Sequence, residues 1–359
     1  MEIHFLGTGS AFPSPKRCSS CTAIRMDSGS VWLFDCGEGG QIQIQKSKIR
    51  PAKISSVFIT HLHGDHMFGL PGMMCTISQA VEGQHLDVYG PMGLKNFLRC
   101  SLSLSFSNLS YSFTVHEIKL PDIQEFMENC DIEIDSEYWQ KLSDFSKREF
   151  PPHPNEVDTN HIIEKNEEGF YHVCYMDRFN VYAADIKHTV PCLGYVLCED
   201  NIPGKLDVTI LKKKGVPAGP LYGKIKNGES ITLDDGTVIS PNDCLGPDRP
   251  GRKIVHLGDT HDPSAIGDLA RGATILIHEA TNENADFEKC LAHGHSTAGM
   301  AGKFACTIEA QKLILTHFSQ RYSEEETNTI LVQEAKETFG SDNVLAAADL
   351  MVVPVLLPR

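Results

Sequence analysis

One short segment of the chain concentrates side chains that bind metal ions. Residues 60–66 read Thr-His-Leu-His-Gly-Asp-His, and nitrogen and oxygen ligands of this kind suit zinc or manganese. His61 and His63 follow an apolar strand at a spacing of two, so their side chains can point to the same side. Gly64 permits a sharp backbone turn, after which Asp65 and His66 can face a neighbouring position. The segment predicts one loop that serves two adjacent ions, against the alternative of a solvated polar turn.

Each ion of such a site needs further ligands, because a catalytic zinc ion takes about three protein ligands and keeps one position for water. His188, Asp259 and His317 are the candidates, since each follows a short apolar strand. A carboxylate at position 259 could bridge two ions. Taken singly, His188 could be a surface histidine and residues 258–260 an ordinary turn. Taken together, the three residues complete two sites.

The elements that must position these residues are short apolar segments rich in β-branched and aromatic side chains. They are residues 3–6, 31–34, 57–60, 181–184, 254–257, 274–277 and 313–316. Their length and composition favour strands, and helical patterns lie between them, at 40–46, 298–307 and 325–338. Open sheets commonly gather functional residues at strand ends. The pattern therefore predicts an α/β fold in which helices cover sheets.

Length and composition restrict the class of protein. The chain has 359 residues, of which 41% are hydrophobic and 22% are charged, and this excludes a disordered chain or a disulfide-rich miniprotein. No apolar stretch approaches the ~18 residues of a membrane span, and no secretory signal is expected. The chain has twelve cysteines, but it is not a small domain that needs disulfide bonds for stability. We therefore expect reduced cysteines and a reducing compartment. We expect one domain over residues 1–359, located in the cytoplasm, with entry into the nucleus left open.

The net charge of −15 is unevenly distributed. Residues 122–168 hold 14 acidic and 4 basic side chains, and we expect an acidic surface insertion there. Residues 203–228 hold six lysines and one aspartate among many glycines and prolines, which predicts a protruding basic arm too broken for regular core structure. Charge alone favours two ordinary solvated segments, so binding of nucleic acid needs further support.

The ligand pattern resembles the metallo-β-lactamase superfamily. Further motifs resemble its tRNase Z (RNase Z) family in the short form, the zinc phosphodiesterases of the ElaC type. These motifs are FLGTGS at 5–10, FDCGEG at 34–39, FGLPG at 68–72, GVPAGP at 215–220, HEAT at 278–281, HGHST at 293–297 and LTHFSQRY at 315–322. The resemblance extends nearly end to end and is weakest over 122–168. Arg17 is followed by Cys18, where the family often has asparagine.

The resemblance implies an αββα metallo-β-lactamase sandwich with a flexible arm, or exosite, and two zinc ions per chain. One ion would bind His61, His63 and His188, the other would bind Asp65, His66 and His317, and Asp259 would bridge them. Asp65 would also accept a proton from the attacking water. The implied activity is endonucleolytic removal of the 3′ trailer from precursor tRNA, which leaves a 3′-hydroxyl on the tRNA.

A proton donor for the leaving ribose oxygen is also expected, because that oxygen is a poor leaving group. His295 is the candidate, and Glu279 could orient and charge it. His293 is the alternative, but the resemblance favours His295 because Ser-Thr follows it. Glu279 could instead support a metal-bound histidine.

In the tRNase Z setting the arm is expected to bind RNA. The candidate residues are Lys212, Lys213, Lys214, Gly215, Pro217, Gly219, Pro220 and Lys224. The resemblance implies a homodimer in which the arm of one subunit holds the precursor tRNA that the other cleaves, without DNA or membrane partners. The alternatives are another hydrolase of the superfamily, such as a small-molecule phosphodiesterase or a thioesterase, and a non-catalytic RNA-binding relic. A relic should have lost ligands, and all seven are present.

Overall fold

The computed structural model describes residues 1–121, 125–126, 149–157 and 161–358. The chain forms two compact units. The first, here called the core unit, comprises Met1–Leu197 and Lys253–Leu356, and the second, the arm unit, comprises Cys198–Arg252 and the residues from Leu357 onward. Much of the predicted acidic insertion at 122–168 lies outside the described residues. Within the described ranges, no helix is long and apolar enough to cross a membrane.

The first sheet of the core unit has the described strand order β17-β1-β2-β3-β4-β5-β6-β7. The strands are β1 (Glu2–Gly7), β2 (Cys21–Arg25), β3 (Val31–Phe34), β4 (Ile54–Phe58), β5 (His85–Pro91), β6 (Ser112–Ile118), β7 (Ile162–Ile163) and β17 (Val352–Pro354). Antiparallel pairing joins β17, β1, β2 and β3, whereas β3 to β7 are parallel. Because β3 and β4 are parallel neighbours, the residues after them, at 35 and 59–66, meet at one edge of the sheet.

The second sheet has the order β16-β15-β14-β13-β10-β9-β8 among the described residues. Its strands are β8 (Tyr171–Met176), β9 (Phe179–Ile186), β10 (Cys192–Glu199), β13 (Lys253–Leu257), β14 (Ile275–Glu279), β15 (Leu313–Thr316) and β16 (Val344–Ala346). Parallel pairing from β13 to β16 brings Asp259, Glu279 and His317 to one edge. The register of this pairing therefore decides which polar side chains can meet.

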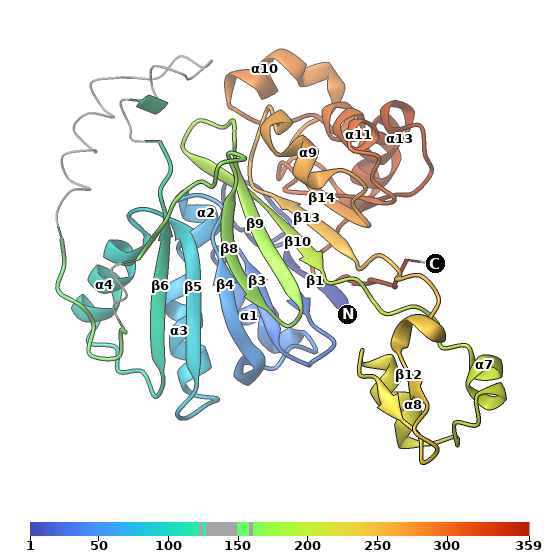
Figure 1. Cartoon of the computed structure of the whole chain (residues 1–359). Helices are drawn as coiled ribbons and strands as arrows, with labels where there is room; N and C mark the ends of the chain where they lie inside the picture. Colours follow the sequence, from blue (N-terminus) through green and yellow to red (C-terminus); the bar gives the residue numbers. More distant parts are fainter. Residues whose placement is uncertain (122–124, 127–148, 158–160, 359) are drawn as a thin grey trace. The chain divides into compact units, whose positions relative to one another are not determined.

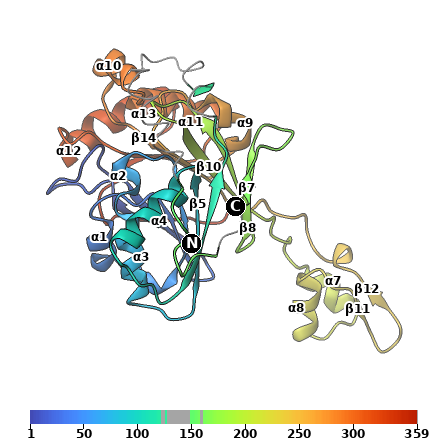
Figure 2. The same cartoon turned by 90° about the vertical axis from the view of Figure 1, so that its left-hand side faces the viewer.

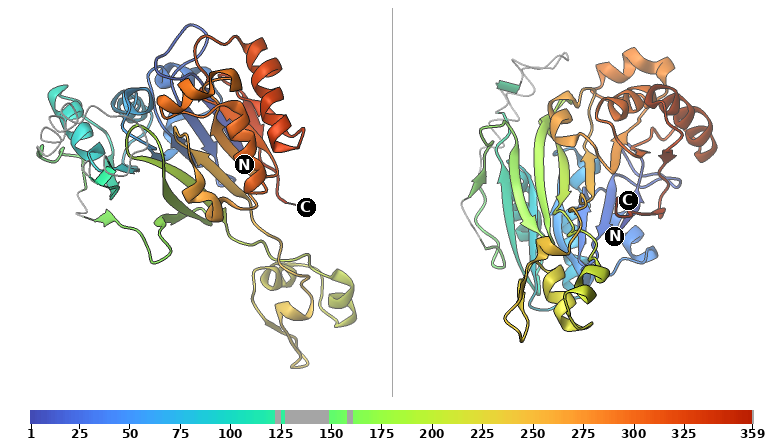
Figure 3. Two further views of the ribbon diagram at one scale, coloured as in Figure 1. Left: turned by 90° about the horizontal axis from the view of Figure 1, so that it is seen from above. Right: turned by 45° about the vertical axis from the view of Figure 1, so that its right-hand side comes forward.

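Helices cover the outer face of each sheet, as Figures 1 and 3 show. The helices next to the first sheet are α1 (Gly40–Lys46), α2 (Gly64–Met67), α3 (Leu70–Ser78) and α4 (Leu94–Leu104). Those next to the second are α9 (Gly267–Ala270), α10 (Phe287–Ala292), α11 (Ala298–Thr307), α12 (Glu324–Glu326) and α13 (Val332–Phe339). Short 3-10 or π-helical turns lie at Pro51–Lys53, Ser264–Ile266, Asn284–Asp286 and Thr327–Leu331. The helix–sheet–sheet–helix layers confirm the predicted αββα arrangement.

The space between the two sheets is filled mainly by large aromatic side chains. Trp32 contacts Phe179 with ring centroids 6.0 Å apart, and Phe58 contacts Tyr195 at 5.5 Å. The neighbours of these residues along β3 and β4, such as Leu33, face the opposite way and pack in a second cluster with helix residues. Burial on both faces explains why residues 31–34 and 57–59 are uninterrupted apolar segments rather than alternating ones.

The arm unit has regular structure and a small apolar cluster of its own. Its elements are α7 (Val208–Lys213), α8 (Pro220–Lys226), the pair β11 (Ile231–Thr232) and β12 (Val238–Ile239), and a 3-10 turn at Pro241–Asp243; Figure 2 labels its helices and strands. The cluster contains Leu211, Val216, Ile225, Ile231, Ile239 and Cys244.

Residues 203–228, expected to be too broken for a core element, lie in the arm unit, whose bounds of 198–252 are wider than the predicted range. Pro220 occupies the first turn of α8, where a proline costs no hydrogen bond. Gly215 and Gly219 have φ of 75° and 145° and lie between the helices. Gly215, Gly219 and Pro220 therefore mark helix boundaries in the arm unit.

Candidate metal centre

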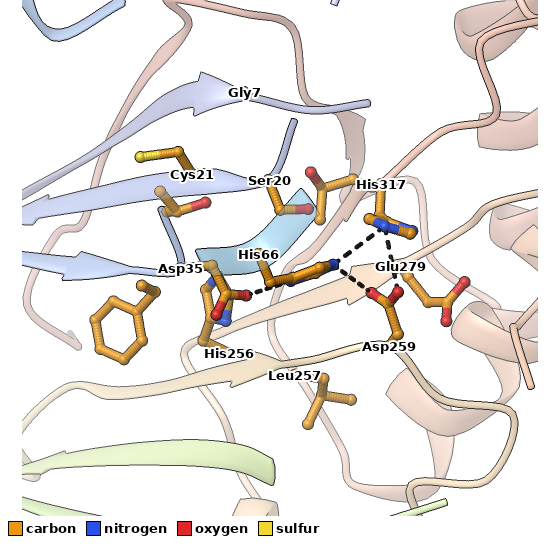
Figure 4. A pocket seen from close by; sticks show the side chains of 13 residues that line it. Gly7, Ser20, Cys21, Asp35, His66, His256, Leu257, Asp259, Glu279 and His317 are labelled. Carbon is orange, nitrogen blue, oxygen red and sulfur yellow. Dashed lines mark hydrogen bonds and ion pairs between the residues drawn. The ribbon is translucent and has the colours of Figure 1, made fainter. Parts of the chain in front are cut away.

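The seven predicted ligand residues come together in the core unit, at the ends of strands from both sheets. They form two groups in which all ligand atoms lie within 4.8 Å of one another: His61, His63, His188 and Asp259 in the first group, and Asp65, His66 and His317 in the second. Figure 4 shows His66, His317 and Asp259 pointing toward one another, with Asp35 at the opposite end of the His66 ring. The local motif and the distant strand ends therefore contribute to one site.

The first group has the spacing of ligands around a single ion. Nδ1 of His63 lies 3.1 Å from Nε2 of His61 and 3.2 Å from Nε2 of His188. Oδ2 of Asp259 lies 3.8 Å from Nε2 of His61 and 3.9 Å from Nε2 of His188. Tetrahedral zinc with bonds of about 2.0–2.1 Å to nitrogen places neighbouring ligand atoms about 3.4 Å apart. The donor set and its spacing fit zinc.

The second group is equally compact and shares Asp259 with the first. Nε2 of His317 lies 3.4 Å from both Nε2 of His66 and Oδ2 of Asp65. Oδ1 of Asp259 lies 3.3 Å from Nε2 of His66, and its Oδ2 lies 3.3 Å from Nε2 of His317. Asp259 thus stands between the two groups, where its carboxylate can bridge two cations.

Polar groups outside the centre hold the imidazoles in place. Nδ1 of His188 donates to the carbonyl oxygen of Gly294 at 2.7 Å. Nδ1 of His61 contacts the hydroxyl of Thr60 at 3.0 Å, and Nδ1 of His317 contacts the hydroxyl of Thr281 at 3.0 Å. Such contacts fix the tautomer and direct the other ring nitrogen to the metal. Nε2 of these three rings consequently faces the ligand cluster.

Asp35 is the functional residue that the sequence analysis did not assign. Its carboxylate lies 2.7 Å from Nδ1 of His66 and accepts both the backbone N–H and the hydroxyl of Thr60. It therefore supports His66 directly and His61 through Thr60, one ligand from each group. Asp35 has φ of 57°, unusual for a residue with a Cβ. The available signal was its position directly after a predicted strand, like the ligands themselves.

The protonation states suit a divalent cation. Burial lowers the pKa of His61 and of His63, and it lowers the pKa of His188 to about 3. Burial opposes ionisation of Asp259, but the neighbouring His317 and His66 hold its pKa well below the usual range. Neutral imidazoles and ionised carboxylates are the forms that bind metal ions.

His66 differs from the other buried histidines of the site. Burial alone would lower its pKa, but the carboxylates of Asp259 and Asp35 raise it well above the usual value. His66 should therefore carry a proton that is released when a cation binds, so that metal affinity rises with pH.

His295 and Glu279 form a contact pair beside Asp259. Nδ1 of His295 lies 3.0 Å from Oε1 of Glu279 and 3.8 Å from Oδ2 of Asp259. Burial lowers the pKa of His295, but the negative charge of Glu279 raises it to about 9. Glu279 also accepts the hydroxyl of Thr281, which contacts His317. Both expectations for Glu279, orienting His295 and supporting a ligand, are compatible with these contacts.

The structure separates the two candidate proton donors. The side chain of His293 is exposed, whereas His295 faces Asp259 and His317, with which it forms a third group able to hold a cation. His295 is therefore the histidine that can reach the reacting atoms, as a donor or as a further ligand.

The comparisons with known proteins agree with this geometry. Residues 1–197 match the family model described as "Anti-Pycsar protein Apyc1". The chain is 41% identical to the human "Zinc phosphodiesterase ELAC protein 1", over 100% of this chain and 99% of the relative. It is 37% identical to "Ribonuclease Z" of Streptococcus pneumoniae (strain CGSP14), over 99% of this chain and 100% of the relative.

Two solved structures bear on the fold. Human tRNase Z, short form, aligns with a TM-score of 0.66 at 32% identity, over 99% of this chain and 100% of that chain. The metallo-β-lactamase fold protein YhfI from Bacillus subtilis aligns with a TM-score of 0.56 at 15% identity, over 98% of both chains, a likeness of fold alone. The predicted metallo-β-lactamase sandwich is confirmed.

Replacing Asp35 by asparagine should weaken zinc binding roughly 10–100-fold, the usual effect of removing a partner of a metal ligand, because His66 and Thr60 lose a charged acceptor. Competition with a chromophoric zinc chelator measures the affinity, and circular dichroism checks the fold. Asp87→Asn is the matched control, since Asp87 contacts His116 at 2.8 Å outside both ligand groups. Equal zinc affinity in the two variants would contradict the supporting function of Asp35.

Proposed function

Since the chain belongs to the ribonuclease Z family, we propose that it is a zinc-dependent endoribonuclease that removes the 3′ trailer from precursor tRNA. The relatives named zinc phosphodiesterase and ribonuclease Z share 37–41% identity with it over nearly its full length. The observation that carries the proposal is the seven-residue ligand cluster with the His295–Glu279 pair beside it. Cleavage leaves a 3′-hydroxyl on the tRNA.

We propose two zinc ions per chain as the cofactor. His61, His63 and His188 would hold one ion, Asp65, His66 and His317 the other, and Asp259 would bridge them, which the donor spacing supports. Bound zinc lowers the pKa of water toward neutrality and neutralises charge on phosphoryl oxygens. The remaining chemistry, the movement of two protons, falls to side chains of this protein.

Asp65 is the proposed proton acceptor. Its Oδ2 accepts the backbone N–H of Ala11 at 2.7 Å and lies 3.4 Å from Nε2 of His317. Burial alone would raise its pKa, but the contacts with His317 and His66 lower it. The carboxylate is therefore ionised at neutral pH and held in place, which is the form that a proton acceptor for the attacking water needs.

His295 is the proposed proton donor. Because its Nδ1 is directed at Glu279, Nε2 is the atom that can face the leaving 3′-oxygen of the tRNA. Glu279 raises the pKa of His295 to about 9, so the ring is protonated at neutral pH. A general acid of this kind contributes ~10²–10⁴ in rate.

The arm unit is the proposed RNA-binding part. The predicted residues Lys212, Lys213, Lys214, Gly215, Pro217, Gly219, Pro220 and Lys224 are all exposed. They occupy the end of α7, the connection, and α8, where Pro220 is in the first turn and Lys224 in the last. Lysines in this arrangement attract phosphates regardless of sequence. A homodimer, in which the arm unit of one subunit holds the tRNA cut by its partner, completes the proposal.

A phosphodiesterase for small substrates is the second candidate function. The match to the Apyc1 family model ends at residue 197, before the arm unit begins at Cys198. The whole metal centre lies in the core unit, so a small diester needs nothing from the arm unit. The full-length identity to ribonuclease Z favours tRNA.

Elemental analysis should find about two zinc ions per chain, and Asp259→Ala should lose at least one of them together with cleavage of a precursor tRNA, because both groups lose their shared carboxylate. Gel analysis of a precursor that carries a 3′ trailer gives the activity. Full zinc content in an inactive Asp259→Ala variant would instead make Asp259 a catalytic residue.

His295→Ala should retain both zinc ions and tRNA affinity but lose ~10²–10⁴ in kcat, the contribution of a general acid. A diester with a nitrophenolate leaving group, which needs no proton, should recover most of that loss. His293→Ala removes an exposed neighbouring imidazole and should behave like the wild type. An equal loss of kcat on both substrates would contradict proton donation by His295. Loss of zinc from the variant would instead identify His295 as a metal ligand.

Replacing Lys212, Lys213 and Lys224 by alanine should weaken tRNA binding and flatten its salt dependence, because fewer phosphates are neutralised. Fluorescence anisotropy of labelled precursor tRNA over a salt series measures both. Hydrolysis of a small diester should be unchanged. The control replaces Lys46, Lys48 and Lys53, which are exposed lysines of the core unit. An equal loss of tRNA affinity in this control would contradict a specific contribution of the arm unit to tRNA binding.

A further inference from the structure

Phe12 is a large aromatic residue that the core unit leaves 58% exposed beside the metal centre. It lies in the connection between β1 and β2. A single exposed apolar side chain is ordinary in proteins, so its meaning depends on where and how firmly it is held.

Hydrogen bonds hold the backbone around Phe12 to Asp65 of the second ligand group and to Gln320, close to His317 of the same group. The N–H of Ala11 donates to Oδ2 of Asp65 at 2.7 Å. The carbonyl oxygen of Phe12 accepts Nε2 of Gln320 at 2.7 Å, and Gln320 follows His317 by three residues. The hydroxyl of Ser14 donates to the same glutamine side chain at 2.6 Å. Consecutive Cα atoms are about 3.8 Å apart, so the backbone of Phe12 is held one residue away from a direct contact with the second ligand group.

The conformation of Ala11 supports a functional reason for this arrangement. Ala11 has φ of 66°, in the left-handed region that residues with a Cβ avoid. Such strain persists where surrounding contacts over-determine the backbone, and it concentrates at functional sites. Here the strained residue turns its N–H toward Asp65 while the next side chain remains in solvent.

The proposed substrate offers a matching surface. Nucleotides at the 3′ end of a precursor tRNA are unpaired, and proteins bind unpaired nucleobases by stacking them on aromatic side chains. If His295 protonates the oxygen of the retained nucleotide, the attacking water enters on the opposite side of the phosphorus. The residue before Phe12 contacts Asp65, the proposed acceptor of that water's proton, so Phe12 lies away from the retained nucleotide. The trailer, joined through an equatorial oxygen of the phosphorus, is then the part of the RNA that can extend toward Phe12.

We propose that Phe12 stacks on the first nucleobase of the trailer and thereby positions the scissile phosphate. The inference rests on the proposed tRNA function and adds to it a specificity-determining residue. Stacking tolerates any base, because every base has a flat face. Phe12 therefore selects a single-stranded trailer without selecting its sequence.

A double-mutant cycle tests the stacking. Phe12→Leu keeps apolar volume but lacks the ring, and a precursor with an abasic first trailer nucleotide lacks the base. Each change alone should lower kcat/KM by roughly 5- to 150-fold, as loss of one base–aromatic stack does. Together they should cost little more than one of them, and Phe12→Trp should retain the wild-type value.

Two controls separate stacking from other effects. Phe106→Leu alters a 93% exposed aromatic residue and should not change cleavage, and Phe12→Leu should hydrolyse a small diester like the wild type. The stacking proposal would be overturned if the two losses of kcat/KM were additive, or if Phe12→Leu cleaved the precursor like the wild type. A changed oligomeric state of Phe12→Leu would also overturn it. None of these outcomes would affect the proposed tRNA function. A wild-type chain that cannot cleave the precursor would overturn the tRNA function as well.

Discussion

The carboxylate of Asp259 is the interaction on which the rest of the core unit depends. It is 3% exposed and lies between the imidazoles of both ligand groups at 3.3–3.9 Å. A buried charge is costly unless opposite charge and hydrogen bonds compensate it. Before a metal ion binds, the protonated rings of His66 and His295 supply part of that compensation, and cations shared by the two ligand groups would supply it in the metal-bound protein. The arrangement therefore suits a metal centre, because the ligand atoms of each group, with Asp259 among those of the first, lie within 4.8 Å of one another.

Holding ligands from two sheets at these distances requires a rigid frame. The aromatic layer between the sheets supplies it, since Phe34 and Phe58 stack at 4.9 Å directly before Asp35 and the ligand loop. The hydroxyl of Tyr195 in the second sheet donates to the carbonyl oxygen of Ile59 in the first at 2.7 Å. Close packing of this kind resists small displacements, and metal affinity depends on displacements well below 1 Å.

The sequence predicts the local parts of this site better than the distant ones. Residues 60–66 contain four potential metal ligands in one short segment, so the sequence alone identifies them. The short apolar strands indicate the positions of His188, Asp259 and His317. The partnership of Asp35 with His66 and Thr60 arises only when β3 and β4 pair in parallel at a given register, which no local pattern encodes. The link from His317 through Thr281 to Glu279 likewise needs β14 beside β15. In the arm unit, glycine and proline indicate turns, but they do not show that the segments between them share an apolar cluster.

The functions proposed for the two units require different degrees of structural precision. The chemistry requires atoms fixed to a fraction of an ångström, and every proposed ligand and proton carrier lies in the core unit, on strand ends and loops anchored by buried hydrogen bonds. Attraction of phosphates by lysines tolerates variable geometry, because it acts over the Debye length of about 8–10 Å. A small unit with a modest apolar cluster is sufficient for that purpose. In the proposed function, this separation lets substrate affinity change through exposed lysines without disturbing the buried charges that the metal centre must balance.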